Sequence, residues 1–267
     1  MFTFFLKKNF ADGWDNLFFL GASNLFVIAL GAILAIVIRP LFALGTIFLT
    51  AGIVVFCALI FVELFAFGSN AAKIAQFDSP SIFSFLKSFH YAWKPGFLCG
   101  VVFAISILIL RVGFSFYLAR FLENGSFVWL LLLASLGWAT LIALIALQWF
   151  IPLYFLQTEN TLFKCLKKSF IIFFDNPSFS AGVFLYNLIL FALSVCLFLL
   201  IPGLNGILLS STNALRLRLY KYDWIDEHPE ALSDRDKRAD VPWNDLLEND
   251  RQALGPRKLS SFIFPWK

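Results

Sequence analysis

Long apolar runs separated by short polar stretches dominate residues 1–221 of the chain. Five of these runs approach or exceed the roughly 20 residues with which an α-helix crosses about 30 Å of hydrocarbon. They cover Leu17 to Ile38, Leu41 to Phe67, Phe97 to Leu118, Val128 to Phe155 and Val183 to Ile201. Because a helix satisfies its own backbone hydrogen bonds, such segments are stable in lipid. The pattern therefore predicts an all-α, polytopic membrane helical bundle.

The turn between the first two runs is almost free of polar residues. Arg39 ends the first run and Pro40 follows it directly. Proline suits the first turn of a helix, where its missing amide hydrogen leaves no bond unmade. We therefore expect a tight helical hairpin in which Pro40 begins the second span. The first run also lacks a small-residue cleavage site, so it should stay in the membrane rather than act as a signal peptide.

A sixth apolar stretch, Leu204 to Leu215, is short and contains Ser210, Ser211, Thr212 and Asn213. Its length alone allows either a short span or a re-entrant segment. Cytoplasmic loops are enriched in Lys and Arg. The lysines flank alternate spans, and a sixth crossing would return the basic residues after this stretch to the side of the N-terminus. We therefore expect about six spans, the sixth short, with the N-terminus and the tail in the cytoplasm.

Two further segments have a helical apolar period but are too short and polar to span, which is typical of amphipathic helices in the membrane interface. The first, residues 81–94, starts after Ser79-Pro80 and ends at Pro95-Gly96. The second is Thr161 to Phe174. Both are predicted to anchor the chain on anionic lipid or to offer a docking surface to a partner. The candidate residues are Phe85, Phe89 and Trp93 in the first and Lys164, Lys167 and Lys168 in the second.

Charge divides the chain into two parts. Residues 1–221 carry 14 basic and 7 acidic side chains, a net charge of +7, whereas residues 222–267 carry 7 basic and 10 acidic ones, a net charge of −3. We therefore expect a transmembrane domain over residues 1–221 and a polar cytoplasmic tail over residues 222–267. The tail ends in an apolar, aromatic cluster flanked by cations, which favours docking on the membrane surface or on a partner. Its candidate residues are Phe262, Phe264 and Trp266.

Four polar side chains interrupt the apolar runs: Glu63, Arg111, Gln148 and Asn187. Ionisable groups inside a membrane are costly, so they are candidate functional sites. Glu63 lies near the cytoplasmic end of its span and Arg111 about 21 Å into the next, so we expect no salt bridge between them. Snorkelling towards opposite interfaces, a substrate path or an inter-span contact would explain the pair. Gln148 and Asn187 are expected to hydrogen-bond between helices.

The sequence offers no recognisable constellation for catalysis, cofactor binding or metal binding. It lacks the HExxH, GxSxG and P-loop patterns that position catalytic or phosphate-binding groups. The four cysteines are far apart and only two histidines accompany them. No stripe of Lys and Arg resembles a nucleic-acid groove. We therefore expect a protein that is not an enzyme, that has no cofactor and does not bind nucleic acid, and whose first partner is the lipid bilayer.

One pattern of residues occurs twice. Lys87-Ser88-Phe89, Pro95 and Gly100 are echoed by Lys168-Ser169-Phe170, Pro177 and Gly182, with the same spacing from proline to glycine. The echo indicates either repeated units of helical hairpin plus surface helix or chance repetition in a biased composition.

Several short features together resemble the YesL-like family of bacterial multi-spanning membrane proteins. They are Asn24-Leu25, the Pro40 hairpin, the small residues around Gly45, the segment Phe83 to Phe89 and the segment from Asn160-Thr161-Leu162 onward. The resemblance covers roughly residues 10–220, and the chain departs from the family at Arg111 and in its long tail. It implies a bacterial inner-membrane protein, often associated with carbohydrate uptake systems, without family-wide catalytic residues.

These features favour an accessory or regulatory membrane protein, associated with the uptake of a carbohydrate or another solute. Its partner would be a membrane protein of an uptake system or a cytoplasmic subunit. A small-solute transporter is the first alternative, and it would need polar groups from several spans around a water-accessible cavity. A structural scaffold is the second. A closed apolar core would argue against the transporter, and an open cavity containing Arg111 or Gln148 would argue against the scaffold.

Overall fold

The computed structural model describes residues 1–158, 160–228 and 241–256, and every regular element in these ranges is an α-helix. The all-α prediction is therefore confirmed. The helices are α1 (Phe2–Asp15), α2 (Leu17–Leu44), α3 (Thr46–Ala75), α4 (Ile82–Asn124), α5 (Phe127–Leu147), α6 (Phe150–Leu156), α7 (Leu162–Asp175), α8 (Pro177–Cys196), α9 (Gly203–Glu227), α12 (Trp243–Leu246) and α13 (Glu248–Leu254).

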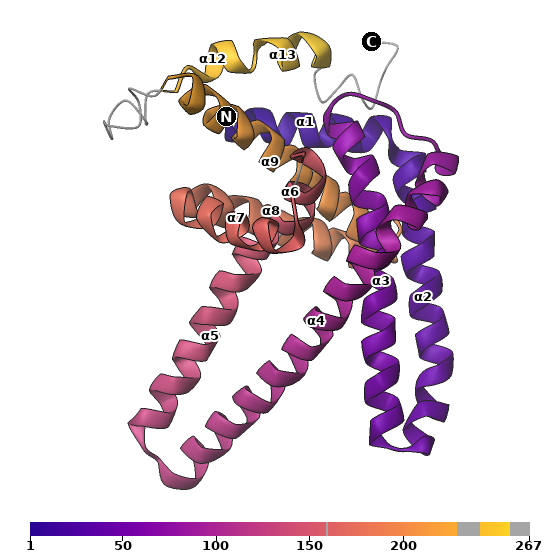
Figure 1. Cartoon of the computed structure of the whole chain (residues 1–267), viewed down its shortest axis with the longest axis vertical. Helices are drawn as coiled ribbons and strands as arrows, with labels where there is room; N and C mark the ends of the chain where they lie inside the picture. The colour runs from indigo at the N-terminus through magenta and orange to yellow at the C-terminus, as the bar shows by residue number, and fades with distance from the viewer. Residues whose placement is uncertain (159, 229–240, 257–267) are drawn as a thin grey trace.

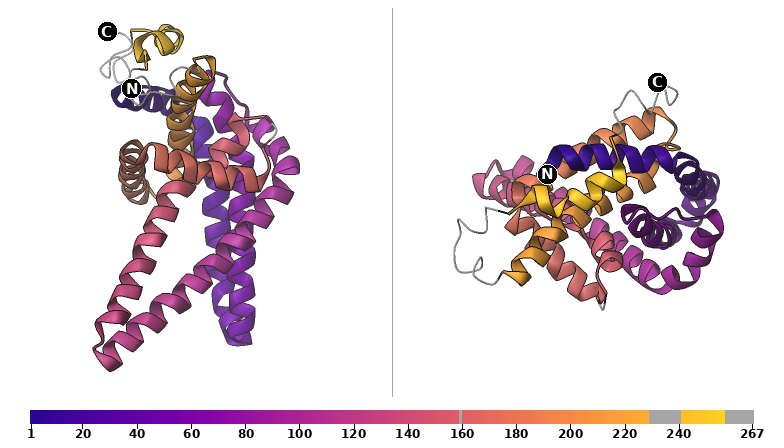
Figure 2. Two further views of the ribbon diagram at one scale, coloured as in Figure 1. Left: turned by 60° about the vertical axis from the view of Figure 1, so that its left-hand side comes forward. Right: turned by 90° about the horizontal axis from the view of Figure 1, so that it is seen from above.

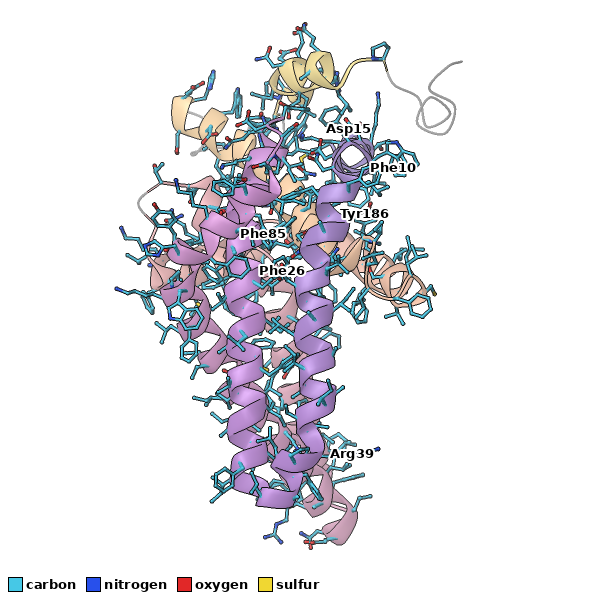
Figure 3. The ribbon with its side chains drawn as sticks, turned by 90° about the vertical axis from the view of Figure 1, so that its right-hand side faces the viewer. Phe10, Asp15, Phe26, Arg39, Phe85 and Tyr186 are labelled. Carbon is cyan, nitrogen blue, oxygen red and sulfur yellow. The ribbon has the colours of Figure 1, made fainter. Side chains whose placement is uncertain are left out.

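Two long helical hairpins extend from a layer of shorter helices. In Figure 1, α2 and α3 lie side by side along the longest axis, while α4 and α5 form a second hairpin that diverges from them. The helix α1 lies across the upper end, and Figure 2 shows α12 and α13 at the same end from two other sides. Arg39 lies at the opposite end of the molecule from Phe10 and Asp15 (Figure 3). We call these two ends the α1 end and the Gly45 end.

Five helical segments are long and apolar enough to cross a membrane, which identifies a multi-pass membrane protein. They are α2, α3, α4, α5 together with α6, and α8. Their large apolar side chains are widely exposed, which suits contact with lipid rather than water. The expected sixth span, Leu204 to Leu215, is not among them, because it forms the first half of α9, which is too polar to qualify. Most of its residues are also buried against other helices. The expected count of six is thus corrected to five candidate spans.

The first hairpin turns at Gly45 and not at Pro40. Pro40 lies inside α2, which continues to Leu44 before the chain reverses. Gly45 has a φ of 117°, a conformation that only glycine adopts readily, and it ends α2 and precedes α3 directly. The expectation that Pro40 begins the second span is therefore wrong. Proline is also tolerated inside a membrane helix, where neighbouring groups can satisfy the backbone carbonyl that it leaves without a partner.

The expected surface helix at residues 81–94 is continuous with the span that follows it. Ser81 caps α4 through a reciprocal pair of hydrogen bonds with Ser84, and the helix runs through Pro95 to Asn124. Gly96 and Gly100 bring α4 against the backbone of α3, since a Cβ atom at either position would collide with Val62 or Ala58. This close packing after Pro95, together with the buried Ala92 before it, holds the two expected elements in one helix, so the predicted break at Pro95-Gly96 is wrong.

The helices α8 and α9 form a hairpin that enters and leaves at the α1 end. Asn24 of α2 hydrogen-bonds to the turn between them. At 1.5 Å per residue, Asn24 is only about 10 Å from the start of α2 and about 30 Å from its end at Leu44. The other end of α8 is at α1, where the rings of Phe179 and Phe2 lie 6.2 Å apart. Both ends of α8 are therefore far from the Gly45 end. The helix α8 is therefore a candidate span by length and composition only, because neither of its ends reaches the Gly45 end. The basic residues after α9 lie at the same end of the molecule as the N-terminus through this hairpin, without a fifth or sixth crossing.

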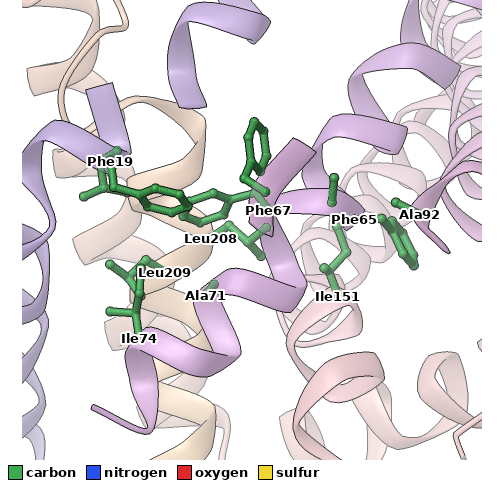
Figure 4. Packing of buried hydrophobic residues seen from close by; sticks show 12 residues of the cluster. Phe19, Phe65, Phe67, Ala71, Ile74, Ala92, Ile151, Leu208 and Leu209 are labelled. Carbon is green, nitrogen blue, oxygen red and sulfur yellow. The ribbon is translucent and has the colours of Figure 1, made fainter. Parts of the chain in front are cut away.

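The apolar core is concentrated where these elements meet. One cluster joins α2, α3, α4, α6 and α9, and Phe19, Phe67 and Leu208 belong to it (Figure 4). The rings of Phe19 and Phe67 are stacked with their centres 6.0 Å apart. A second cluster joins α1, α6, α7, α8 and α9 around Trp149, which is fully buried.

Part of the expected polar tail also packs on the rest of the chain. The helix α9 runs continuously past residue 221 to Glu227. Further on, Leu247 is fully buried in the second cluster, and Leu254 packs on Ala11 of α1. The start of the expected tail thus continues α9, and residues 241–256 contain two short helices at the α1 end.

Candidate functional site: the polar face of α9

Fourteen of the 25 residues of α9 are buried, and many of them are polar. Together with the half-buried Arg216 and Tyr222, these residues bond to α1, α2, α3, α7, α8 and α13. We call these bonds the α9 network, and its α9 members are Asn205, Ser211, Asn213, Arg216, Lys221 and Tyr222. A buried polar group is costly unless it is hydrogen-bonded, so each bond fixes the position of one helix relative to α9.

Asn24 of α2 holds the start of α9. Its Nδ2 donates to the carbonyl oxygens of Leu200 and Pro202 at 2.9 and 2.8 Å, and its Oδ1 accepts from the backbone N–H of Asn205 at 3.1 Å. Gly203 lies directly on this side chain, has a φ of 66°, and leaves no room for a Cβ atom. The turn therefore requires both the Asn24 amide and a glycine at position 203.

Glu63 of α3 faces the same turn. Its Oε1 accepts a 2.8 Å hydrogen bond from Nδ2 of Asn205, while its Oε2 is buried without a hydrogen-bond partner among the described residues. The residue is 1% exposed. The expected snorkelling of Glu63 to the interface is therefore wrong, because α9 covers it and supplies the polar partner that water would have been.

Gln148 and Asn187 form the interhelical bonds expected of them. Asn187 of α8 donates to Oγ of Ser211 at 2.9 Å and to Oε1 of Gln148 at 3.4 Å. Gln148, at the junction of α5 and α6, in turn donates to the carbonyl oxygen of Ser180 at 2.9 Å. These three side chains line a cavity of about 320 Å³ between α3, the α5–α6 junction, α8 and α9. We call it the α8–α9 pocket.

A third layer of the network lies nearer to α1. Nδ2 of Asn213 donates to Oδ1 of Asn9 at 3.2 Å, and Nδ2 of Asn9 donates to the hydroxyl of Tyr186 at 3.1 Å. Sequence reasoning missed Asn9, Asn205 and Asn213 as site residues. A signal for two of them was available in the sequence. Asn205 and Asn213 are about two helical turns apart, on the same side of a helix, in a polar segment between apolar ones.

Charged pairs close the α1 end of the network. Lys8 is fully buried and donates to Oδ2 of Asp12 at 2.9 Å, with its ammonium 3.6 Å from the centre of the Phe77 ring. Burial lowers the pKa of Lys8 and raises the pKa of Asp12, while the opposite charge of each acts against its partner's shift. Arg216 makes two hydrogen bonds to Asp250, at 2.8 and 3.0 Å, which tie α13 to α9.

A further pair ties α7 to α9. Asp175 accepts hydrogen bonds from Lys221 at 3.1 Å and from the Tyr222 hydroxyl at 2.9 Å. Burial alone would raise the pKa of Asp175, but these donors hold it below its ordinary value. The carboxylate is therefore ionised wherever the two helices are packed at neutral pH.

The other predicted residues lie apart from the network. Arg111 is exposed on α4 and does not line the α8–α9 pocket. Phe85 is 1% exposed and its ring lies 5.4 Å from that of Phe26, so it packs within the chain (Figure 3). Phe89 packs on the same two rings, at 5.1 Å from Phe85 and 5.8 Å from Phe26. The docking role expected for Phe85 and Phe89 is therefore wrong, and only Trp93 of this set is exposed.

The second amphipathic helix agrees better with expectation. The helix α7 begins after Thr161, whose hydroxyl accepts from the N–H of Lys164, and it exposes Lys164 and Lys167. Lys168 differs, because its Nζ donates to Gln157 at 2.7 Å and to Asn160 at 2.9 Å. Lys168 therefore holds the connection between α6 and α7, and it is not free to contact lipid or a partner as expected. Phe262, Phe264 and Trp266 lie outside the described residues.

The hydrogen bonds described for this site position the helices around α9. Within the described ranges, no group of three or more His, Cys, Asp and Glu side chains is placed to hold a metal ion. The groups that converge on α9 are amides, hydroxyls, paired charges and the Glu63 carboxyl group, and the polar residues of the α8–α9 pocket are uncharged. Comparisons with protein-family models, with curated proteins and with solved structures find no match for the chain. The resemblance to the YesL-like family therefore stays a prediction.

Proposed function

We propose that this chain is a non-enzymatic accessory or regulatory protein of the bacterial inner membrane that couples its membrane helices to a partner at the α1 end. The observation that carries the proposal is the α9 network. It fixes α1, α7 and α13, at one end of the molecule, to α2, α3 and α8 through hydrogen bonds that are buried or partly buried. A displacement of the α1 end would therefore move the spans as well.

The exposed face of α7 is the surface that we assign to the partner. Phe163, Ile171 and Phe174 are 75%, 52% and 67% exposed, and the exposed Lys164 and Lys167 lie on the same helix. Large exposed apolar groups beside cations suit either a partner protein or anionic lipid. We place this face in the cytoplasm because Lys7, Lys8 and the α7 lysines gather at the α1 end.

The association with uptake of a carbohydrate or another solute belongs to the same proposal. It is supported by the resemblance in sequence to the YesL-like family. A transporter in its own right is supported less well, since the pocket that contains Gln148 is lined mainly by Leu, Ile and Phe and not by groups that would hydrate a sugar. The same open pocket speaks against a purely structural scaffold.

In-cell photo-cross-linking tests the partner surface. A photoreactive phenylalanine analogue at Phe163 or Phe174 should give one discrete protein adduct, and the paired change Lys164→Glu and Lys167→Glu should abolish it. Phe198, which is 87% exposed in the α8–α9 turn, is the control position and should not give that adduct. The same adduct from all three positions, or none from any, would mean that α7 only rests on lipid.

Uptake is tested separately. Cells that lack the chain should take up one class of solute more slowly, and the parent chain should restore the rate while the double lysine variant should not. Unchanged uptake of sugars and other solutes in the deletion strain would remove the link to transport and leave the partner surface standing.

A further inference from the structure

The α8–α9 pocket combines an apolar interior with one polar end. Nine of its twelve lining residues are Leu, Ile or Phe, and the other three are Gln148, Asn187 and Ser211. No charged residue lines it. A cavity of about 320 Å³ is within the range of small-molecule sites, and its few convergent polar groups are of the kind that orient a ligand.

The pocket opens towards lipid. Leu188 and Phe191 of α8 line it and are also 48% and 45% exposed, and Leu185 and Ile189 beside them are 60% and 66% exposed. In a helix long and apolar enough to lie in a membrane, such an exposed apolar surface faces hydrocarbon chains. A ligand therefore reaches the pocket from the bilayer.

The polar end of the pocket faces the α1 end of the molecule. Along α9, Leu204 and Ile207 are near the turn that binds Asn24, whereas Ser211 is higher, about 10 Å from Leu204 at 1.5 Å per residue. The apolar part thus points into the bilayer, and the amides lie towards the headgroups on the α1 side. This is the orientation of a lipid in the leaflet at the α1 end.

One buried amide lacks a partner. Asn187 is 7% exposed, and although its Nδ2 donates to Ser211 and Gln148, its Oδ1 has no donor among the described residues. A buried amide oxygen without a bond is costly, and a hydroxyl group is a donor that would satisfy it without bringing a charge into apolar surroundings.

We propose that the α8–α9 pocket binds a neutral, single-chain amphiphile of the monoacylglycerol type. Its chain occupies the apolar part between α8 and α9, and its hydroxyl head hydrogen-bonds with Asn187, Gln148 and Ser211. An anionic head is disfavoured because the pocket provides no cation. A cavity of about 320 Å³ holds the head and the first part of one chain, and the rest of that chain extends past Leu188 and Phe191 into the bilayer.

The test uses the full-length chain in phosphatidylcholine nanodiscs and a 1-monoacylglycerol with a diazirine in its chain. Photolabelled peptides should come from α8 and from the first half of α9. Unlabelled 1-monooleoylglycerol should compete at least tenfold better than oleate, because only the oleate head is charged. If oleate competes with the photolabel as well as 1-monooleoylglycerol does, or if maltose alone competes with it, the proposed ligand class is overturned.

Variants give the matched comparison. Ile207→Trp fills the pocket and Leu188→Trp blocks its mouth, so each should reduce labelling about tenfold, and Asn187→Leu should do the same by removing the amide. Leu185→Trp adds the same bulk on the exposed face of α8, outside the pocket lining, and should leave labelling unchanged. Leu188 is half exposed, so its variant should fold even if Ile207→Trp does not. Labelling that survives Leu188→Trp, or that falls equally with Leu185→Trp, would overturn the proposal.

Discussion

At the scale of single residues, Asn24 and Glu63 show how a side chain can organise a membrane fold. Asn24 is fully buried and satisfies two carbonyls and one N–H at the α8–α9 turn. Glu63 was singled out from the sequence as a costly intramembrane acid, but its partner, Asn205, lies 142 positions away in the chain. Sequence spacing carries no information on such a pair, so the residue was predictable and its contact was not.

The first prediction concerns Glu63. Glu63→Ala removes the acceptor of the buried Asn205 amide and should lower the free energy of unfolding by about 1–3 kcal/mol. Glu63→Gln keeps an oxygen at the same position and should remain close to the parent. Thermal unfolding in mild detergent measures both. Equal losses for the two variants would show that charge, and not the hydrogen bond, is what Glu63 supplies.

The second prediction concerns Asp175. A folded-state pKa below the ordinary 3.8 means that this carboxylate stabilises the protein fully above that pH and loses its effect as the pH falls through the lowered pKa. Asp175→Asn should therefore unfold at a lower temperature than the parent at pH 7, and the difference should shrink below pH 3.8. A difference that stays constant into strong acid would contradict the ionic tie between α7 and α9.

At the scale of elements, α4 shows packing overriding a local signal. Pro95 and Gly96 read as the end of a helix, and the matching Pro177 does begin a new helix, α8, after the break at Asn176. In α4, however, Ala92, Gly96, Gly100 and Ala104 are buried on both sides of the proline. Small residues four positions apart allow two helix backbones to approach closely, and that contact continues across Pro95. The repeat in sequence is thus not a repeat of elements.

The third prediction tests this contact. Gly100→Leu places its side chain on the backbone of Ala58 and should cost about 1–3 kcal/mol or more, since a backbone cannot move aside as a side chain can. Gly137→Leu is the control, because a Cβ atom at Gly137 meets no atom within 4 Å. Unfolding temperatures in detergent compare the two, and similar losses would show that α3 and α4 are not in close contact.

The fourth prediction tests the α8–α9 hairpin. In a chain whose four cysteines are replaced by alanine, Ser126→Cys at the α4–α5 turn should react with an impermeant thiol reagent added outside intact cells. Phe198→Cys at the α8–α9 turn should not react, because that turn lies on the α1 side of the membrane. A six-span topology puts both turns outside, so labelling of both cysteines would restore that topology.

At the scale of the whole molecule, α9 links the spans to the layer at the α1 end. The second core cluster brings Trp149, Leu215 and Leu247 together from three distant parts of the chain. Arg216 and Asp250 add a paired charge at the same place, with side chains 17% and 4% exposed. The segment at residues 241–256 is therefore part of the folded unit and not a solvated appendage.

The fifth prediction concerns this segment. Asp250→Ala leaves Arg216 without its bidentate partner and should weaken the docking of α13 by about 1.5–3 kcal/mol, the usual worth of hydrogen bonds to charged groups. Trypsin should then cleave after Arg251 several times faster than in the parent. Asp245→Ala removes an exposed acid and is the control. Equal cleavage rates in the two variants would show that Arg216 does not hold α13.

The sequence by itself determined that the chain is an all-α membrane protein, because the length and apolarity of a segment decide whether lipid can surround it. It also determined that α7 is amphipathic and that Gln148 and Asn187 bond between helices. Only the tertiary structure decided that Leu204 to Leu215 lies within the protein, that Phe85 is internal and that Glu63 meets Asn205. The physical reason is that lipid and a neighbouring helix are equally apolar surroundings for a leucine or a phenylalanine. The apolarity of a single side chain therefore cannot distinguish a position in the bilayer from one enclosed by other helices, and the buried asparagines of α9 act through partners far away in the chain.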